Sequence, residues 1–351
     1  MPSQKPKIPA LVFLENAELR AFNTLALPAI AAHLTTLSAV EQLPELCQKS
    51  EFIGRRRLIL GSGSNLVFTR DFDGLVLHMA IAGRKLVGED DRAWYVQAGA
   101  GENWHEFVTW TLGNGWPGLE NLALIPGTVG AAPIQNIGAY GLEISERLHS
   151  IEAYDFVEHQ SMSFKQKDCR FAYRDSLFKQ EGWHLAGRLA ITSVTFRLAK
   201  SWAALTRYAD LASELETHGI NSPSPRQIAN AVITIRQRKL PDPLILPNVG
   251  SFFQNPLVDA QTAQRLAMRY PNLPRYPQSN GEVKLAAGWL IEQAGWKGRS
   301  LGPAGMYERQ ALVLVNHGGA GGRDIVALAE AVQAEVKQRF AIELKPEPVF
   351  V

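Results

Sequence analysis

The sequence predicts an α+β protein, and two observations support this fold class. First, the chain carries both short apolar runs of strand length and longer amphipathic runs with helical spacing. Second, neither a Walker A sequence nor a GxGxxG fingerprint occurs, which excludes the common α/β nucleotide-binding folds. The strand runs are 57–60, 66–68, 74–79, 94–98, 151–154, 189–198 and 311–315. The helical runs are 102–112, 226–238, 284–293 and 324–340, and the stretch 25–46 is rich in helix formers with a capping-box pattern at 38–41.

The composition is that of a globular protein with two or three domains. Hydrophobic residues make up 46% and charged residues 20% of its 351 residues. A formal net charge of +2 gives no electrostatic reason to expect nucleic-acid or membrane binding. Cys47 and Cys169 form no disulfide or metal-binding pattern, so we expect no metal. The basic start of the chain carries only a short apolar patch, and no stretch reaches the length of a membrane span, which predicts a cytoplasmic protein.

The stretch 125–141, IPGTVGAAPIQNIGAYG, is the clearest functional feature of the sequence. It combines glycines with small alanines, which allow positive φ and close backbone approach. No helix or strand period runs through it, so burial of an apolar face is not its purpose. Backbone N–H groups on such a turn suit a phosphate, with Thr128, Gln135 and Asn136 as neutral hydrogen-bonding side chains. Composition alone leaves two interpretations open, a pyrophosphate-binding loop and a tight glycine-rich connection.

A second glycine loop lies at 61–65, between two predicted strands. Its Gly-Ser-Gly-Ser-Asn sequence lacks the third glycine of a dinucleotide fingerprint, because Leu66 stands at that position. Ser62, Ser64 and Asn65 offer several hydrogen-bonding groups. We therefore favour a nucleotide contact over a simple turn.

Three single residues have both a chemical and a structural interpretation. Arg174 stands among aromatic residues next to Asp175, which fits either an ion pair or a bidentate carboxylate binder. Ser251 follows a glycine, but Phe253 stands where a hydrolase nucleophile elbow needs its second glycine. Glu347 lies between two prolines, which fix an extended segment suited to acid–base chemistry or to an edge strand.

Taken in order and at these separations, the motifs resemble one family. They are 61–65, 125–131, 173–176, 239–241, 250–253 and 346–347. Each is weak alone, but the ordered set resembles the UDP-N-acetylenolpyruvoylglucosamine reductases over nearly the whole chain. The resemblance implies a two-part FAD-binding module of the vanillyl-alcohol-oxidase (PCMH) type, followed by a C-terminal α+β substrate-binding domain. It implies the division 1–79, 80–222 and 223–351, with a polar, proline-rich break at 221–225.

The resemblance also implies a reaction and its catalytic residues. NADPH would reduce FAD, and the reduced flavin would pass a hydride to C3 of the enolpyruvyl ether of UDP-N-acetylglucosamine, giving UDP-N-acetylmuramate for peptidoglycan. Arg174 and Glu347 match positions that stabilise the aci-carboxylate intermediate, with Glu347 protonated or sharing a proton. Ser251 matches the proton donor to C2, with Lys239 as a neighbour in a proton relay.

Further family contacts fall on residues of this chain. The resemblance implies FAD contacts from Gly61, Ser62, Gly63, Ser64, Asn65, Leu66, Gly127, Thr128, Gly130, Ala131, Gln135, Asn136, Gly138, Ala139, Gly141 and Arg236. It implies substrate contacts from Tyr208, Lys239, Asn255, Tyr276, Lys284 and Gln310. Tyr208 and the segment 260–283 resemble the type I branch, in which the tyrosine closes over the substrate as a lid. The backbone amides of 125–141 are then expected on the FAD pyrophosphate, with 138–141 near the flavin.

Three departures from the family pattern stand out. Gln254 replaces a lysine that many members carry, and Lys345 replaces a glutamate that often precedes the proline. The chain also ends at Val351, without the tail of longer members. None of these departures removes a catalytic position, and we expect a monomer.

Two other functions fit a flavin module. One is an FAD-dependent oxidase or dehydrogenase of small alcohols, which would have no use for Ser251 and Glu347. The other is a flavin or nucleotide binder without catalytic activity. The sequence favours the reductase, because the motifs of the second half belong to that family.

Overall fold

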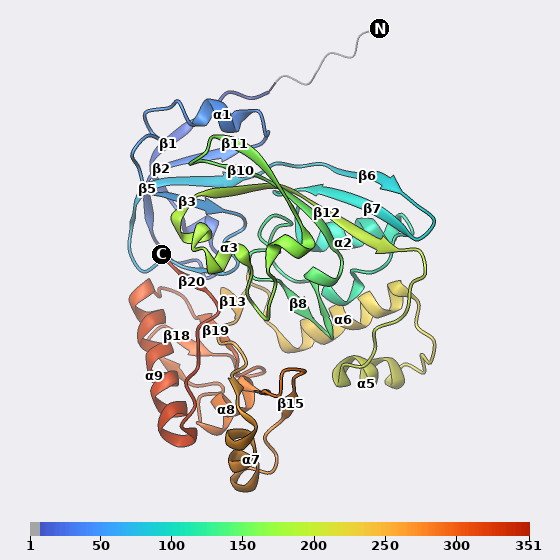
Figure 1. The fold of residues 1–351 in the computed structure, drawn as a ribbon. Coiled ribbons are helices and arrows are strands. Elements are labelled where there is room, and N and C mark those ends of the chain that lie inside the picture. Colours follow the sequence, from blue (N-terminus) through green and yellow to red (C-terminus); the bar gives the residue numbers. More distant parts are fainter. Residues whose placement is uncertain (1–7) are drawn as a thin grey trace. The chain divides into compact units, whose positions relative to one another are not determined.

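The computed structural model describes residues 8–351, which form two compact units (Figure 1). Unit 1 comprises the described residues up to 17, together with 30–62 and 72–236. Unit 2 comprises 18–29, 63–71 and 237–351. The basic residues 1–7, on which part of the localisation argument depends, lie outside the described residues. The three-part division into 1–79, 80–222 and 223–351 stays a prediction.

Unit 1 contains two sheets that supply its framework. In the first, β1 (Phe13–Glu18), β2 (Ile30–Leu37), β5 (Phe72–Met79) and β3 (Arg57–Leu60) lie in the order β1-β2-β5-β3, and β2 and β3 run parallel to β5. The second is antiparallel, in the order β11-β10-β12-β7-β6. Its strands are β11 (Gln160–Lys165), β10 (Leu148–Asp155), β12 (Leu189–Ala199), β7 (Ala93–Gly99) and β6 (Arg84–Glu89).

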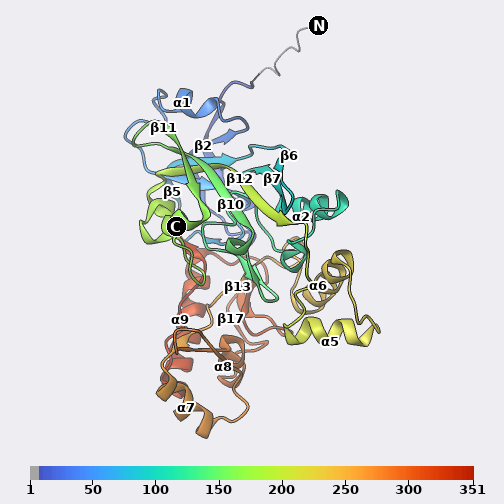
Figure 2. The same ribbon diagram turned by 45° about the vertical axis from the view of Figure 1, so that its right-hand side comes forward.

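Helices of unit 1 bury their apolar side chains in the same core as the antiparallel sheet. Trp104 and Phe107 of α2 (Trp104–Gly113) meet Phe196 of β12, with ring centroids 5.8 and 5.2 Å apart. Helix α5 (Ala209–Thr217) lies beside α6 (Pro225–Lys239), and both contribute to this core (Figure 2). Shorter elements complete the unit: α1 (Gln42–Leu46), η2 (Glu120–Leu122), β8 (Gly138–Ala139), β9 (Leu142–Glu143), η3 (Ile144–Glu146), η4 (Gln166–Cys169), α3 (Leu177–Gln180) and α4 (Trp183–Ala186).

Unit 2 is built from short strands and three longer helices. One sheet has the order β13 (Asn248–Ser251), β19 (Val313–Asn316), β18 (Ala304–Met306) and β17 (Ser300–Leu301). A second has the order β14 (Leu257–Val258), β16 (Val283–Leu285) and β15 (Arg275–Pro277), and β20 (Val349–Phe350) pairs in parallel with β4 (Leu66–Val67). The helices are α7 (Ala260–Arg269), α8 (Ala287–Gln293) and α9 (Gly322–Phe340), with the short η1 (Arg20–Phe22) in the same unit.

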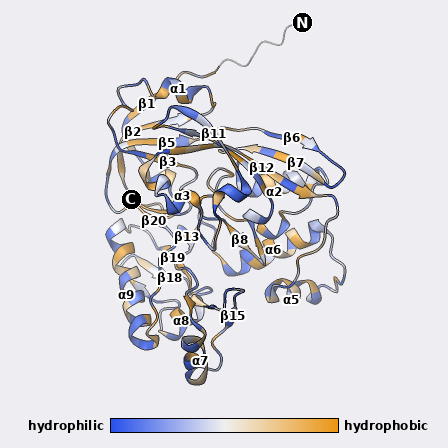
Figure 3. Cartoon of the chain, in the orientation of Figure 1, coloured by the Kyte–Doolittle hydropathy of each residue, from blue (hydrophilic) through white to orange (hydrophobic). Residues whose placement is uncertain are grey.

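Helix α9 shows why this unit is stable. Hydrophobic and hydrophilic residues alternate along it at helical spacing (Figure 3), and Ile325, Leu328, Val332 and Val336 are fully buried. Burying such a side chain contributes about 1.5–3 kcal/mol relative to exposure. The amphipathic pattern predicted at 324–340 is therefore confirmed, with a start two residues earlier.

Most predicted strands and helices are confirmed, and three expectations need correction. Lys284 lies in strand β16 and not in a helix, because α8 begins only at Ala287 after an extended Ala286. The stretch 25–46 forms strand β2 before the short helix α1. The capping box at 38–41 is wrong, since the Gln42 side chain reaches back to accept hydrogen bonds from the backbone N–H groups of Ser38 and Ala39.

Within residues 8–351, no helix is long and apolar enough to span a membrane. The same part of the chain holds no group of three or more histidine, cysteine, aspartate or glutamate side chains that could bind a metal ion.

Candidate functional site

The stretch 125–141, which we call the cofactor loop, is fixed at its entrance by two side chains of unit 1. Leu124 adopts a positive φ of 59° immediately before the loop. Its N–H donates to Nδ1 of His105 at 3.1 Å, and its carbonyl accepts from Nε of Arg236 at 3.1 Å. Because Nδ1 accepts, the His105 proton lies on Nε2, and burial lowers the pKa of the imidazole. Both the N–H and the carbonyl of Leu124 therefore have a side-chain hydrogen-bond partner.

The backbone of the first half of the cofactor loop is hydrogen-bonded to other backbone groups of unit 1. The amides of residues 129–132 donate to backbone oxygens at 2.9 to 3.2 Å. A Cβ at Gly61 would lie 2.6 Å from Oγ1 of Thr128, so a side chain there would displace the Thr128 hydroxyl. The two glycine-rich stretches predicted to bind cofactor thus meet at Gly61 and Thr128. Since four amides are engaged, Gly127 and Thr128 are the positions of this half best placed to bind a phosphate.

The second half of the cofactor loop leads into a hairpin of β8 and β9, which Asn136 supports through side-chain hydrogen bonds. Asn136 is fully buried, and its Nδ2 donates to Oε2 of Glu143 at 2.7 Å and to the carbonyl of Ala172 at 3.0 Å. Its Oδ1 accepts from the N–H of Ser145 at 3.1 Å. The Asn136 side chain is therefore a structural support, and its contact with the cofactor stays a prediction.

Arg174 lies at the corner of a tight turn beside this hairpin. Ala172 and Asp175 exchange two backbone hydrogen bonds of 3.1 Å, which leaves Arg174 with a φ of 55°. Its Nη2 donates to the carbonyl of Gly138 at 2.8 Å. The permanent cation predicted as catalytic is thus attached to the cofactor loop.

Arg236 and two tyrosines complete this part of unit 1. Burial lowers the pKa of the Arg236 guanidinium, and an interaction with the Tyr140 hydroxyl opposes this shift. The Tyr140 ring meets the Tyr208 ring edge-on, with centroids 5.2 Å apart and planes at 73°. A half-buried cation beside a glycine-rich loop without acidic residues suits a phosphate. These residues therefore fit FAD.

In unit 2, the loop after Ser62 pairs with the C-terminal segment. A Cβ at Gly63, whose φ is 64°, would lie 2.0 Å from the carbonyl oxygen of Phe22. The Asn65 carbonyl accepts from the N–H of Val349 at 3.0 Å, and its Nδ2 donates to the Glu347 carbonyl at 3.3 Å. This pairing places Asn65 next to Glu347.

Ser251 and Glu347 lie on adjacent backbone segments of unit 2. The N–H of Glu347 donates to the carbonyl of Phe252 at 2.8 Å, and the N–H of Gln254 donates to that of Lys345 at 2.9 Å. Phe252 is fully buried, which fixes this backbone, whereas Ser251 is exposed at the end of β13. Two predicted catalytic residues are thus brought together, on an extended segment as the prolines predict.

The predicted substrate residues of unit 2 gather around β16 and the start of α8. Tyr276 and Lys284 are direct cross-strand partners. Asn255 accepts through Oδ1 from the first N–H of α8, at Ala287, at 2.9 Å. Oε1 of Gln310 lies 3.1 Å from the position that a Cβ on Gly288 would take.

Lys239 is placed by a different contact in the same unit. It ends α6 and leads into a turn that Asn248 holds, because Nδ2 of Asn248 donates to the Pro241 carbonyl at 3.0 Å. The same side chain accepts from the N–H of Gly250 at 2.9 Å. The turn after Lys239 is therefore attached to the strand that carries Ser251.

Sequence reasoning missed the residues that support these segments. His105, Glu120, Asn121 and Asn248 hold loops in place through side-chain hydrogen bonds. A usable signal existed for Glu120 and Asn121, because two polar residues stand inside an otherwise apolar run at 119–125.

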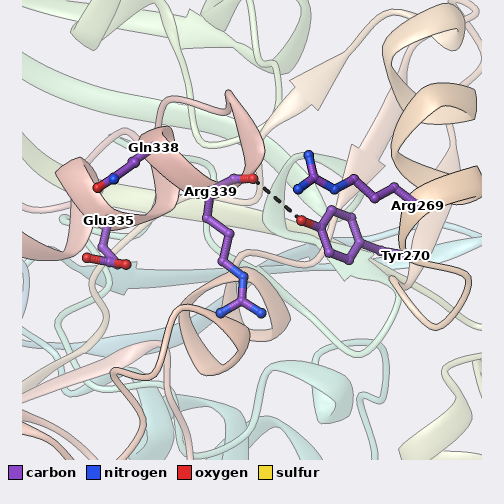
Figure 4. A pocket seen from close by; sticks show the side chains of 5 residues that line it. All are labelled: Arg269, Tyr270, Glu335, Gln338 and Arg339. Atoms are coloured by element: carbon purple, nitrogen blue, oxygen red, sulfur yellow. Dashed lines mark hydrogen bonds between the residues drawn. The ribbon is translucent and has the colours of Figure 1, made fainter.

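A hollow of about 580 Å³ on unit 2 lies apart from these residues. It is lined by Arg269, Tyr270, Glu335, Gln338 and Arg339 (Figure 4). The Tyr270 hydroxyl donates to the Arg339 carbonyl across it at 3.5 Å. None of the predicted site residues lines this hollow, so it is not the candidate site.

Comparison with known proteins identifies the family of this chain. Residues 242–351 match the C-terminal domain of UDP-N-acetylenolpyruvoylglucosamine reductases, and residues 28–157 match an FAD binding domain family. The UDP-N-acetylenolpyruvoylglucosamine reductase of Dechloromonas aromatica (strain RCB) is 63% identical over 336 residues, which cover 96% of this chain and 98% of the relative. That of Azoarcus sp. (strain BH72) is 56% identical over 347 residues, covering 98% and 99%.

A solved structure shares the fold over its whole length. The crystal structure of the UDP-N-acetylenolpyruvylglucosamine reductase from Thermus caldophilus gives a TM-score of 0.65 at 21% identity, covering 97% of this chain and 98% of that one. The α+β fold class, with an FAD-binding part before the family's C-terminal domain, is confirmed. The FAD-dependent oxidoreductase class is confirmed with it. The chain belongs to the UDP-N-acetylenolpyruvoylglucosamine reductase family.

Proposed function

We propose that this chain catalyses the NADPH-dependent, FAD-mediated reduction of UDP-N-acetyl-3-O-(1-carboxyvinyl)-glucosamine to UDP-N-acetylmuramate, a step of peptidoglycan synthesis. One observation carries the proposal beyond family membership. The 2.8 Å hydrogen bond from Glu347 N–H to the Phe252 carbonyl sets a carboxyl group beside the strand that bears the Ser251 hydroxyl. A carbanion next to a carboxylate needs a proton donor and a stabilised oxyanion, which these two side chains supply.

FAD would be held mainly by residues of unit 1, with further contacts from residues 63–66. The residues of unit 1 are Gly61, Thr128, the hairpin 138–141 and Arg236. The chemistry supplied by bound FAD is hydride transfer, from NADPH and then to C3 of the enolpyruvyl double bond. The remaining predicted cofactor contacts, including Gln135 and Asn136, belong to the same proposal.

The catalytic residues then handle charge and the proton. Hydride addition at C3 moves the electron pair of the double bond to C2 and onto the substrate carboxylate. Arg174 would stabilise that charge as a permanent cation, and Glu347 would donate a hydrogen bond to the same oxygens. Ser251 would give its hydroxyl proton to C2, forming the new C–H bond, and regain a proton through Lys239.

Substrate recognition and cellular context complete the proposal. Asn255, Tyr276, Lys284 and Gln310 would contact the sugar nucleotide from unit 2, and Tyr208 would close over it as a lid in the type I manner. The protein would work in the cytoplasm as a monomer, without nucleic-acid or membrane partners.

The visible spectrum of the purified protein tests the activity. Under anaerobic conditions, NADPH should bleach the flavin absorbance, and the enolpyruvyl nucleotide should restore it. Fast reoxidation by oxygen with small alcohols as reductants, and none by the nucleotide, would contradict the proposal.

Ser251→Ala tests the role of the hydroxyl. We expect flavin reduction by NADPH within about twofold of wild type, and reoxidation by the nucleotide slowed by roughly 10²–10⁴-fold, because only the second step needs the proton. Stopped-flow absorbance measures both steps. Ser50→Ala, which removes a hydroxyl bonded only locally to Glu51, serves as the control. Equal losses in both steps would rule out Ser251 as the proton donor.

A further inference from the structure

Two buried polar residues precede the cofactor loop and belong to none of the predicted contacts. Glu120 and Asn121 lie in η2 and are 2% and 0% exposed. A buried polar group left without a partner costs about 1–3 kcal/mol. The partners that these side chains do have therefore indicate what the pair stabilises.

Asn121 connects two segments that are far apart in sequence. Its Nδ2 donates to the carbonyl of Tyr140 at 2.9 Å and to the carbonyl of Leu205 at 2.8 Å. Both acceptors are carbonyls, so the amide orientation is fixed, because a rotated amide would set its oxygen against them. Tyr140 belongs to the cofactor loop, and Leu205 belongs to the irregular segment 200–208 between β12 and α5, which we call the lid segment. The Asn121 side chain therefore connects the cofactor loop to the lid segment.

Glu120 holds the same lid segment at a second point. Its Oε1 accepts from Nε1 of Trp202 at 2.6 Å, and its Oε2 accepts from the N–H of Gly118 at 2.7 Å. Positions 202 and 205 of the lid segment are thus attached to two consecutive residues of η2. The lid segment has no regular secondary structure, so these side-chain hydrogen bonds, and not a helix or a sheet, hold it in position.

Tyr208 stands at the end of the lid segment, as the residue that precedes α5. It is 45% exposed, and its ring meets that of Tyr140 at 5.2 Å. Asn121 therefore bonds to the backbone of Tyr140 itself and to the backbone of Leu205, three residues before Tyr208. We propose that Asn121 is a positioning residue for the substrate reaction, which holds the lid segment on the cofactor loop so that Tyr208 is presented to the sugar nucleotide. This inference rests on the proposed substrate role of Tyr208.

The remaining atom of Asn121 argues against a purely stabilising role. Its Oδ1 is buried and accepts no hydrogen bond from the described residues. A side chain serving stability alone would not retain an unsatisfied buried oxygen. Asn121→Leu has similar volume and removes that oxygen while leaving two carbonyls unpaired, so the two effects on folding oppose each other.

The test compares steady-state and half-reaction kinetics of Asn121→Leu with wild type. We expect KM for the enolpyruvyl nucleotide to rise about tenfold, with flavin reduction by NADPH and FAD content unchanged within about twofold. Asn114→Leu is the control, because Asn114 is exposed and its Nδ2 donates to one backbone carbonyl, that of Trp110 at 2.8 Å, within its own helix end and not to two distant segments. If Asn121→Leu does not fold, Trp202→Phe loosens the same segment from Glu120 and should raise the same KM by a smaller factor.

A double-mutant cycle separates positioning from a general structural role. If Asn121 acts through Tyr208, Asn121→Leu will raise KM no further in a Tyr208→Ala background. Additive effects of the two substitutions on KM would overturn the inference while leaving the proposed function intact. An unchanged KM in Tyr208→Ala would overturn both the lid role and the inference. Wild-type protein that bleaches with NADPH but is never reoxidised by the nucleotide would instead contradict the proposed function.

Discussion

The two units position their functional residues by different means. In unit 1, side chains hold the cofactor loop: His105 and Arg236 fix Leu124, and Asn136 supports the 138–143 hairpin. In unit 2, backbone hydrogen bonds hold the segment 345–347, from the Glu347 N–H to the Phe252 carbonyl and from the Gln254 N–H to the Lys345 carbonyl. Substitution of Asn136 in unit 1 should therefore disturb structure, whereas substitution of Glu347 in unit 2 should disturb chemistry alone.

Residues with a side chain and a positive φ gather in and around the cofactor loop. Leu124, Asn136, Tyr140 and Arg174 have φ between 46° and 59°, a conformation that costs about 1 kcal/mol or more for residues with a side chain. Near Ser251 and Glu347 in unit 2, glycine takes this conformation at Gly63 and Gly250, with φ of 64° and 68°, although Ala26 and Ala341 of that unit also have φ of 52° and 57°. Strain of this kind persists only where surrounding contacts enforce it, which explains the buried polar side chains under the cofactor loop.

The largest expected effect is chemical and lies in unit 2. Glu347→Gln keeps the backbone bond to Phe252 and should leave the free energy of unfolding within about 0.5 kcal/mol of wild type. Loss of the acidic proton should slow flavin reoxidation by the nucleotide roughly 100-fold or more, while reduction by NADPH stays near wild type. Stopped-flow kinetics and denaturant unfolding measure the two quantities. Glu343→Gln, at an exposed carboxyl paired with Lys337, should change neither.

Two outcomes for Glu347→Gln would contradict these expectations. A Glu347→Gln protein that is strongly destabilised would show that the side chain, and not the backbone pairing, positions the segment. Normal reoxidation kinetics in that variant would contradict the proposed role of Glu347 in the reaction.

The next effect is structural and lies in unit 1. Asn136→Ala removes three hydrogen bonds in a fully buried place and puts alanine at a φ of 46°. We expect a loss of roughly 3 kcal/mol in unfolding free energy, measured by denaturant titration. Asn16→Ala is the control, because Asn16 has a similar φ of 49° but is exposed. Equal losses in the two variants would show that only the backbone conformation matters.

How far the sequence could predict this site depends on the kind of signal. Motifs proposed to carry chemistry, such as those of Arg174 and Ser251, were identifiable because their residue types and order match a family. Strand and helix patterns placed most elements, but Lys284 lies in a strand because pairing with Tyr276 overrides its helix-forming neighbours. Supporting residues such as Asn121 stand out in the sequence only as polar residues inside an apolar run, and the sequence does not show their partners, because both are distant backbone carbonyls. Only the folded chain shows what they hold.

The smallest expected effect concerns His105 at the entrance of the cofactor loop. Burial lowers the pKa of His105, Glu106 opposes this shift, and Arg236 adds to it. The folded pKa lies below the unfolded value, so the stabilising contribution is present above about pH 6.5 and is lost as pH falls through the folded pKa. His105→Asn retains an acceptor near the Leu124 N–H and cannot titrate. It should lose less stability between pH 7.5 and 5.5 than wild type, by up to about 1 kcal/mol in denaturant unfolding. His159→Asn, at an exposed turn, should lose as much as wild type, and an equal loss in His105→Asn would show that His105 does not control the loop.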